Sequence, residues 1–109
     1  MDVDFNQPML NAYGQPIEQD GEPLLLGHVC VNALNAVHQG DKRSGTEKIA
    51  CWKMSQSMID RHDTEYGFRA ISIKAKEITM LQDLIEKIYP SPTIYAQACE
   101  MLEPEKVGQ

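Results

Sequence analysis

The segment 68–102 constrains the fold most strongly, because two hydrophobic periods follow each other there and proline separates the elements. Apolar residues alternate with small or polar ones over 70–74, which is the pattern of a half-buried strand. Large aliphatic residues then recur at helical spacing over 78–88. Tyr89 stands before a proline, and a residue in that position avoids the helical region, so we expect the helix to end there.

A further helix is predicted directly after this break. Ser91 can accept hydrogen bonds from unpaired backbone N–H groups, and Pro92 suits the first helical position because its missing N–H would have no partner there. The helix should run to about Leu102. The polar residues of the whole segment fit helix caps, breaks and solvent-facing positions, which indicates a scaffold rather than a chemical site.

The N-terminal part, residues 1–26, reads as a turn-rich lead-in with one small hairpin. Asp20-Gly21 supplies the positive φ values that a two-residue hairpin turn requires. Pro16 and Pro23 flank this turn, and proline cannot donate to a strand ladder. We therefore expect a short hairpin at an edge.

Two helices are predicted between the hairpin and the strand. The first spans Gly27 to Val37, with Gly40 placed as its C-terminal glycine. Ser44-Gly45-Thr46-Glu47 matches a capping box and opens the second helix, which should run to about Arg61. Residues 62–68 are interpreted as a loop. The side chains expected to face inward from the second helix are Ile49, Trp52, Met54, Met58 and Ile59.

These elements predict an α+β fold: a small single domain of about four helices, an N-terminal β-hairpin and one further short strand. Residues 1–103 form the compact domain, with 1–26 as the hairpin lead-in and 27–103 as the helical part, and 104–109 form a flexible tail. The strand at 70–74 needs a partner for its backbone groups. We favour pairing with the hairpin in a three-stranded sheet; the alternative is an open edge used for association.

The charge of the chain disfavours nucleic acid as a partner. The net charge is −6 and the pI is near 4.9, whereas binding to nucleic acid depends on Lys and Arg neutralising phosphates. No apolar run approaches the roughly 20 residues that span a bilayer. The N-terminus carries acidic residues where a secretory signal carries basic ones, so we expect a cytoplasmic protein.

No residue pattern indicates a metal, a cofactor or a catalytic centre. Cys30, Cys51 and Cys99 are far apart and lie in apolar contexts, which favours reduced, buried thiols. His28 and Cys30 lack the paired spacing of structural zinc ligands. The paired carboxylates lie near the two ends of the chain. We therefore expect a protein without enzymatic activity and without cofactors.

Four methionines and two aromatic residues at helical spacing supply the one functional hint. They are Met54, Met58, Met80, Met101, Trp52 and Tyr95. Methionine adapts to irregular surfaces, so such a face can receive a partner protein, although in a small domain it more often fills the core. Trp52, Met58 and Tyr95 are the candidate interface residues.

The turn and cap residues resemble those of small uncharacterised proteins of tailed phages and prophages. The resemblance is carried by the segments Asp2-Val3-Asp4-Phe5, Gln7-Pro8-Met9-Leu10, Gly14-Gln15-Pro16-Ile17, Asp20-Gly21-Glu22-Pro23, Ser44-Gly45-Thr46-Glu47-Lys48 and 78–103. It spans nearly the whole chain and implies a phage or prophage origin and a location in the host cytoplasm. It provides no catalytic residues to carry over.

From the sequence we expect one of two functions. The first is a protein–protein interaction role, such as an assembly or accessory factor that holds a phage structural or host protein. The alternative is an acidic inhibitor of a host nucleic-acid-binding defence or regulatory protein. The alternative requires one acidic face formed by Asp2, Asp4, Glu18, Asp20, Glu22, Asp63 and Glu65.

Overall fold

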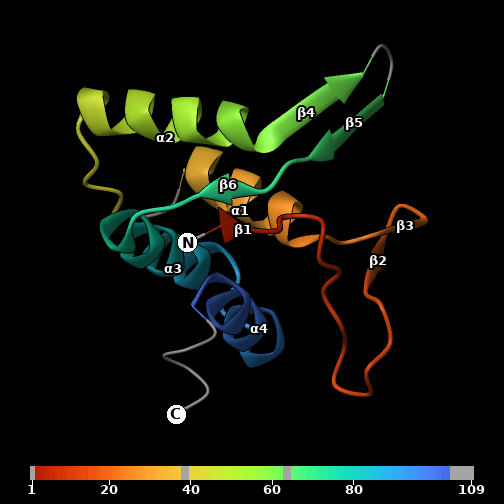
Figure 1. The fold of residues 1–109 in the computed structure, drawn as a ribbon. Helices are drawn as coiled ribbons and strands as arrows, with labels where there is room; N and C mark the ends of the chain where they lie inside the picture. The colour runs from red at the N-terminus through yellow and green to blue at the C-terminus, as the bar shows by residue number, and fades with distance from the viewer. Residues whose placement is uncertain (1, 38–39, 63–64, 104–109) are drawn as a thin grey trace.

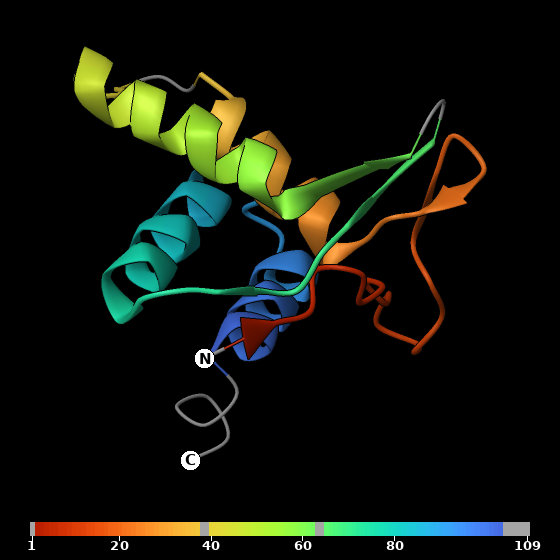
Figure 2. The same cartoon turned by 45° about the horizontal axis from the view of Figure 1, so that its top comes forward.

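The central element of the fold is helix α1 (Leu26–Asn35), against which the three other helices pack. The computed structural model describes residues 2–37, 40–62 and 65–103. Six of the ten residues of α1 are buried, because neighbours cover it on several sides. Figures 1 and 2 show α2 (Gly45–Met58) on one side of α1 and α3 (Ala75–Ile88) and α4 (Pro92–Leu102) on the other.

The last two helices follow the sequence prediction closely. α3 ends at Ile88, directly before the Tyr89-Pro90 break, and α4 begins at Pro92. Ser91 takes the N-cap position, but the predicted capping hydrogen bond of its side chain is absent. α3 buries an aliphatic stripe on one face, and α4 buries Ala98 and Leu102. The predicted α+β fold with four helices in one small domain is confirmed. Residues 104–109, predicted as a flexible tail, lie outside the described residues.

Helix α2 begins as predicted but differs in its end and its orientation. Ser44 Oγ accepts from the Glu47 backbone N–H at 3.1 Å, and Glu47 Oε1 lies 3.5 Å from the Ser44 nitrogen, so the capping box is confirmed. The helix ends at Met58 rather than near Arg61. The expected inward orientation of Ile49 and Trp52 is wrong: their side chains are 57% and 55% exposed.

Small side chains explain this orientation of α2. Cys51, Ser55 and Met58 form the buried face, at the spacing of one helical stripe. Two of these residues are small, so α2 can approach α1 closely there. Ile49 and Trp52 lie off this stripe and face solvent. Because α2 has no wide apolar stripe, it packs against α1 through this narrow face.

Arg43, rather than Gly40, completes the end of α1. The helix ends at Asn35, and Gly40 adopts a left-handed φ of 81° in the following loop. The Arg43 guanidinium donates to the carbonyl oxygens of Leu34 and Ala36 at 2.9 and 2.8 Å. Asp41 binds the same guanidinium at 2.7 Å and raises the pKa of Arg43 further above its usual range. A side-chain cation thus satisfies carbonyls that a helix end leaves unpaired.

Within the described part of the chain, the strands form three separate antiparallel pairs. β2 (Glu18–Gln19) and β3 (Glu22–Pro23) form the predicted hairpin, with φ values of 53° at Asp20 and 81° at Gly21. β6 (Ile71–Ser72) pairs with β1 (Asp2–Val3), so the favoured three-stranded sheet with the hairpin is wrong. β6 has only two residues because the chain turns into α3 at Ala75.

A second hairpin replaces the loop predicted at 62–68. β4 (Ile59–His62) continues directly from α2, and β5 (Glu65–Phe68) pairs with it from Ile59–Phe68 to His62–Glu65. Figure 1 shows this hairpin extending away from the helices. The polar sequence at 62–65 is typical of a loop, which explains the prediction. The buried Phe68 anchors the base of the hairpin.

Gly27, in the first turn of α1, provides the first testable prediction. A Cβ atom at this position would lie 2.3 Å from Cγ of the buried Phe68 ring. The ring cannot yield without disturbing the core, so Gly27→Ala should lower the free energy of unfolding by about 1–3 kcal/mol. Urea unfolding followed by circular dichroism measures this change.

Gly45 supplies the matched control, because a Cβ atom there meets nothing within 4 Å and the residue also lies in the first turn of a helix. Gly45→Ala should be neutral or slightly stabilising. Equal unfolding midpoints for the two variants would contradict the close contact between Gly27 and Phe68.

Candidate functional site

The cysteines take structural positions. Cys30 and Cys51 are buried, Cys99 is partly buried, and all three are free thiols. Burial raises the pKa of Cys30 to about 12, so this thiol remains protonated and is a weak nucleophile. Burial also raises the pKa of Cys99, and a hydrogen bond with Tyr95 opposes that rise. Within the described residues, no three His, Cys, Asp or Glu side chains gather as metal ligands.

His28 acts as a cap for α1. Its Nδ1 atom accepts from the Leu25 backbone N–H at 3.0 Å, in the manner of the reciprocal bond of a capping box. Its ring packs edge-on against Phe68, with 5.0 Å between the ring centroids. Burial lowers the pKa of His28, and the nearby Glu22 carboxylate partly offsets this effect. The side chain is thus held in the neutral form as part of the scaffold.

The outer side of α2 carries the most prominent exposed apolar residues on a regular element. Among the residues whose exposure is described, four large apolar side chains are exposed: Tyr13, Val37, Ile49 and Trp52. Ile49 and Trp52 are three residues apart on α2 and so lie on neighbouring turns. Lys48 and Lys53 are exposed beside them. We call these four residues, Lys48, Ile49, Trp52 and Lys53, the α2 face.

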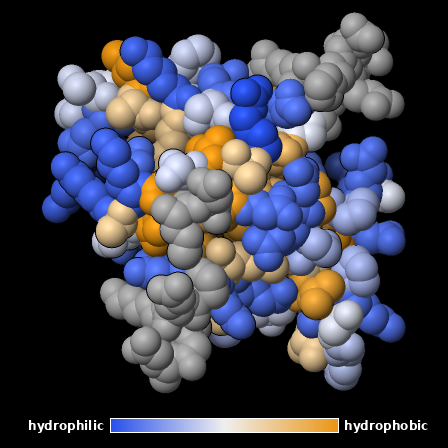
Figure 3. All heavy atoms as spheres, viewed as in Figure 1, coloured by the Kyte–Doolittle hydropathy of each residue, from blue (hydrophilic) through white to orange (hydrophobic). Residues whose placement is uncertain are grey.

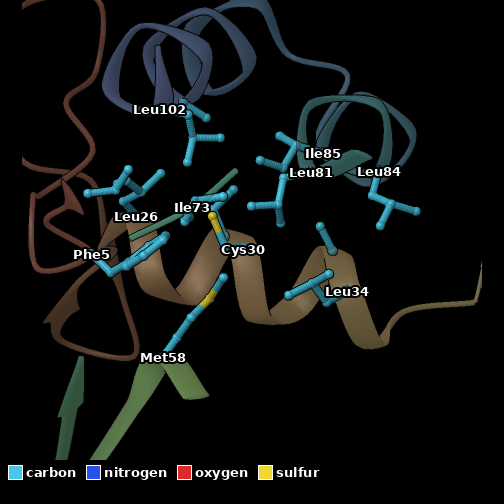
Figure 4. Close-up of a cluster of buried hydrophobic side chains, with 14 of the residues drawn as sticks. Phe5, Leu26, Cys30, Leu34, Met58, Ile73, Leu81, Leu84, Ile85 and Leu102 are labelled. Carbon is cyan, nitrogen blue, oxygen red and sulfur yellow. The ribbon is translucent and has the colours of Figure 1, made fainter. Parts of the chain in front are cut away.

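The three predicted interface residues do not share a surface. Trp52 is exposed on the α2 face. Met58 is fully buried and extends from the end of α2 toward Cys30 (Figure 4), so it serves the core. Tyr95 is partly buried on α4, where its hydrogen bond to Cys99 raises its pKa. Figures 1 and 2 both place α2 and α4 at opposite ends of the helical layer.

Sequence reasoning missed Ile49 and the two lysines as surface partners of Trp52. The available signal was the absence of a wide apolar stripe in 45–58, which left two large apolar residues outside the stripe of Cys51, Ser55 and Met58. Figure 3 shows that the face toward the viewer carries small apolar areas separated by hydrophilic side chains. A local contact site, rather than a broad apolar interface, fits this distribution.

A concave feature lies between the N-terminal residues 3–14 and the α4 residues 92–101. This concavity, which we call the arm groove, has a volume of about 1040 Å³ and opens to solvent. Gln97 fixes its two walls together: its Oε1 accepts from the Leu10 N–H at 2.8 Å, and its Nε2 donates to the Leu10 and Thr93 carbonyl oxygens. The groove is therefore a defined part of the fold.

The chain matches no protein-family model, no curated protein and no solved structure. No described helix has the length and apolar character needed to cross a membrane.

The depressed pKa of His28 predicts a pH dependence of stability. The unfolded chain takes up this proton near the ordinary pKa of 6.5, whereas the folded chain does so only at lower pH. The free energy of unfolding should therefore fall as the pH is lowered from 7 through 6.5 and on toward the folded-state pKa. Urea unfolding at a series of pH values measures this slope.

His28→Gln is the matched variant, because a glutamine oxygen can accept the same Leu25 N–H and takes up no proton in this range. The slope between pH 7 and 5 should be smaller in this variant. An unchanged slope would show that other groups cause the pH dependence.

Proposed function

We propose that this chain is a non-enzymatic phage or prophage protein that acts by protein–protein interaction in the host cytoplasm, as an assembly or accessory factor. Its binding site is the α2 face, with Trp52 as the anchor. The phage origin is supported by the resemblance of the turn and cap segments described above. The interaction role is supported by the exposure of Trp52 and Ile49 on one helix.

The exposure of Trp52 is the observation that carries the proposal. It is the single tryptophan of the chain, and more than half of its side-chain surface faces water. Most other large apolar residues are buried, so the domain gains little stability from this residue. Tryptophan is enriched among the residues that dominate binding energy at interfaces. Such a side chain next to Ile49 fits a pocket on a partner.

The charges beside Trp52 indicate which kind of partner surface fits. Lys48 and Lys53 are exposed next to it in a chain with a net charge of −6. The complementary surface is an apolar pocket with an acidic rim. Arg43 does not extend this patch, because its guanidinium is held by Asp41 and the end of α1. Two lysines are few for binding to a phosphate backbone, so a protein fits better than nucleic acid.

The acidic-inhibitor alternative receives less support. Of the acidic residues that this alternative requires, Glu18, Asp20 and Glu22 are exposed on the β2–β3 hairpin and Asp4 is exposed on the N-terminal segment. Exposed carboxylates outside that set, such as Asp83 and Glu86, lie on α3. Figures 1 and 2 place this hairpin and α3 on opposite sides of the molecule. The side chains of Asp2 and Glu65, and residue Asp63, lie outside the described part. Exposed carboxylates thus also lie away from the hairpin, so the acidic charge is not confined to the predicted face.

The first test separates binding from stability. Trp52→Ala removes an exposed side chain, so the free energy of unfolding should change by no more than about 0.5 kcal/mol. In the unmodified chain, the emission of the single tryptophan should be that of a water-exposed indole. A blue-shifted emission of the isolated monomer would show that Trp52 is not available to a partner.

The second test identifies the partner by site-specific photo-crosslinking in infected or induced host cells. A photoreactive amino acid replaces Ile49 on the α2 face, or Glu86 on α3 as the control. The proposal expects one discrete product from position 49 that is absent from position 86 and is lost with Trp52→Ala. A phage structural protein in that product would support an assembly role, and a host DNA-binding protein the alternative. Equal products from both positions would exclude the α2 face as the site.

A further inference from the structure

The arm groove has apolar walls, and the charged residues among its described lining are acidic. Apolar side chains from both walls line it, including Val3, Leu10, Ala96 and Met101. The charged residues among its lining are Asp4 and Glu100, one from each wall, and both are exposed. No lysine or arginine is among the described lining residues. The groove thus offers apolar contact between two carboxylates.

The polar side chains of the groove are held by the protein itself. Asn11 Oδ1 accepts from the backbone N–H groups of Tyr13 and Gln15 at 2.9 and 3.1 Å. Gln7 Nε2 donates to the Asp4 carbonyl oxygen at 2.8 Å. With Gln97 bound to the Leu10 backbone, the walls are set before any ligand arrives. A site organised in this way loses little conformational entropy on binding.

Tyr13 places an aromatic ring at the turn beside the groove. It stands between Ala12 and Gly14, which both line the groove, and its side chain is 89% exposed. Gly14 has a φ of 79° and its N–H donates to the Asn11 carbonyl oxygen at 3.0 Å, so the turn is tight. Ammonium and guanidinium groups are attracted both by an aromatic ring and by carboxylates, and the margin of the groove carries both kinds of group.

We infer that the arm groove binds an extended segment of a partner protein in which lysine or arginine alternates with apolar residues. The volume of about 1040 Å³ exceeds that of most small-molecule pockets, and the open shape admits a continuous chain. The apolar residues contact Leu10, Ala96 and Met101, and the cations lie near Asp4 and Glu100. This site is separate from the α2 face and does not depend on it.

The test uses two short fluorescein-labelled peptides, one alternating valine with lysine and the other alternating valine with glutamate. Fluorescence anisotropy should show binding of the lysine peptide and none of the glutamate peptide. Asp4→Asn combined with Glu100→Gln should weaken binding of the lysine peptide about tenfold, as expected for two exposed ion pairs. Ala96→Arg, at an exposed helical position, should abolish binding by filling the groove.

Asp83→Asn combined with Glu86→Gln is the matched control, because it removes the same charge from exposed positions on α3. This variant should bind the lysine peptide like the unmodified chain. Equal weakening in both double variants would show general attraction to an acidic protein and would overturn the inference. So would the absence of lysine-peptide binding, or binding unaffected by Ala96→Arg.

A second copy of this chain is the other possible occupant, and light scattering distinguishes it. The inference expects the same mass for the unmodified chain and for Ala96→Arg. A dimer that Ala96→Arg converts to a monomer would assign the groove to self-association instead.

Discussion

The close contact between Gly27 and Phe68 is the constraint on which the rest of the structure depends. The absence of a side chain at Gly27 lets the Phe68 ring lie against the first turn of α1. The N-terminal segment joins at the same point, because the Gly27 N–H donates to the Phe5 carbonyl oxygen and Asn6 pairs with the Phe68 backbone. The His28 ring packs edge-on against the same Phe68 ring. One junction thus positions the central helix, the second hairpin and the N-terminal segment.

Both proposed binding surfaces exist because α2 and α4 each bury only a narrow part of their side-chain surface. α2 packs through the narrow stripe of Cys51, Ser55 and Met58, which leaves Trp52 facing solvent. α4 buries only Ala98 and Leu102 completely, and its side near the N-terminal segment stays open as the arm groove. Because the two surfaces lie at opposite ends of the molecule, two partners could be held at once, which fits an assembly or accessory role.

Local chemistry explains which elements could be predicted. The Asp20-Gly21 turn, the capping box of Ser44 and Glu47, and the proline breaks around α4 depend on neighbours within a few residues, and all are present. The β4–β5 hairpin was missed because the polar sequence at 62–65 is typical of a loop. Spacing alone did not show that Met58 is buried and Trp52 is exposed.

The sequence by itself determined the class of fold, the four helices, the first hairpin and the capping box of α2, because periodicity, capping residues, proline and glycine act locally. Only the tertiary structure decided that β6 pairs with β1, that Arg43 completes α1, and that Gln97 joins α4 to the N-terminal segment. Each of these contacts joins residues from different parts of the chain, and the local sequence pattern does not identify the partner. Which side of a polar helix faces the core also depends on the shape of its neighbours, and that choice placed Trp52 at the surface.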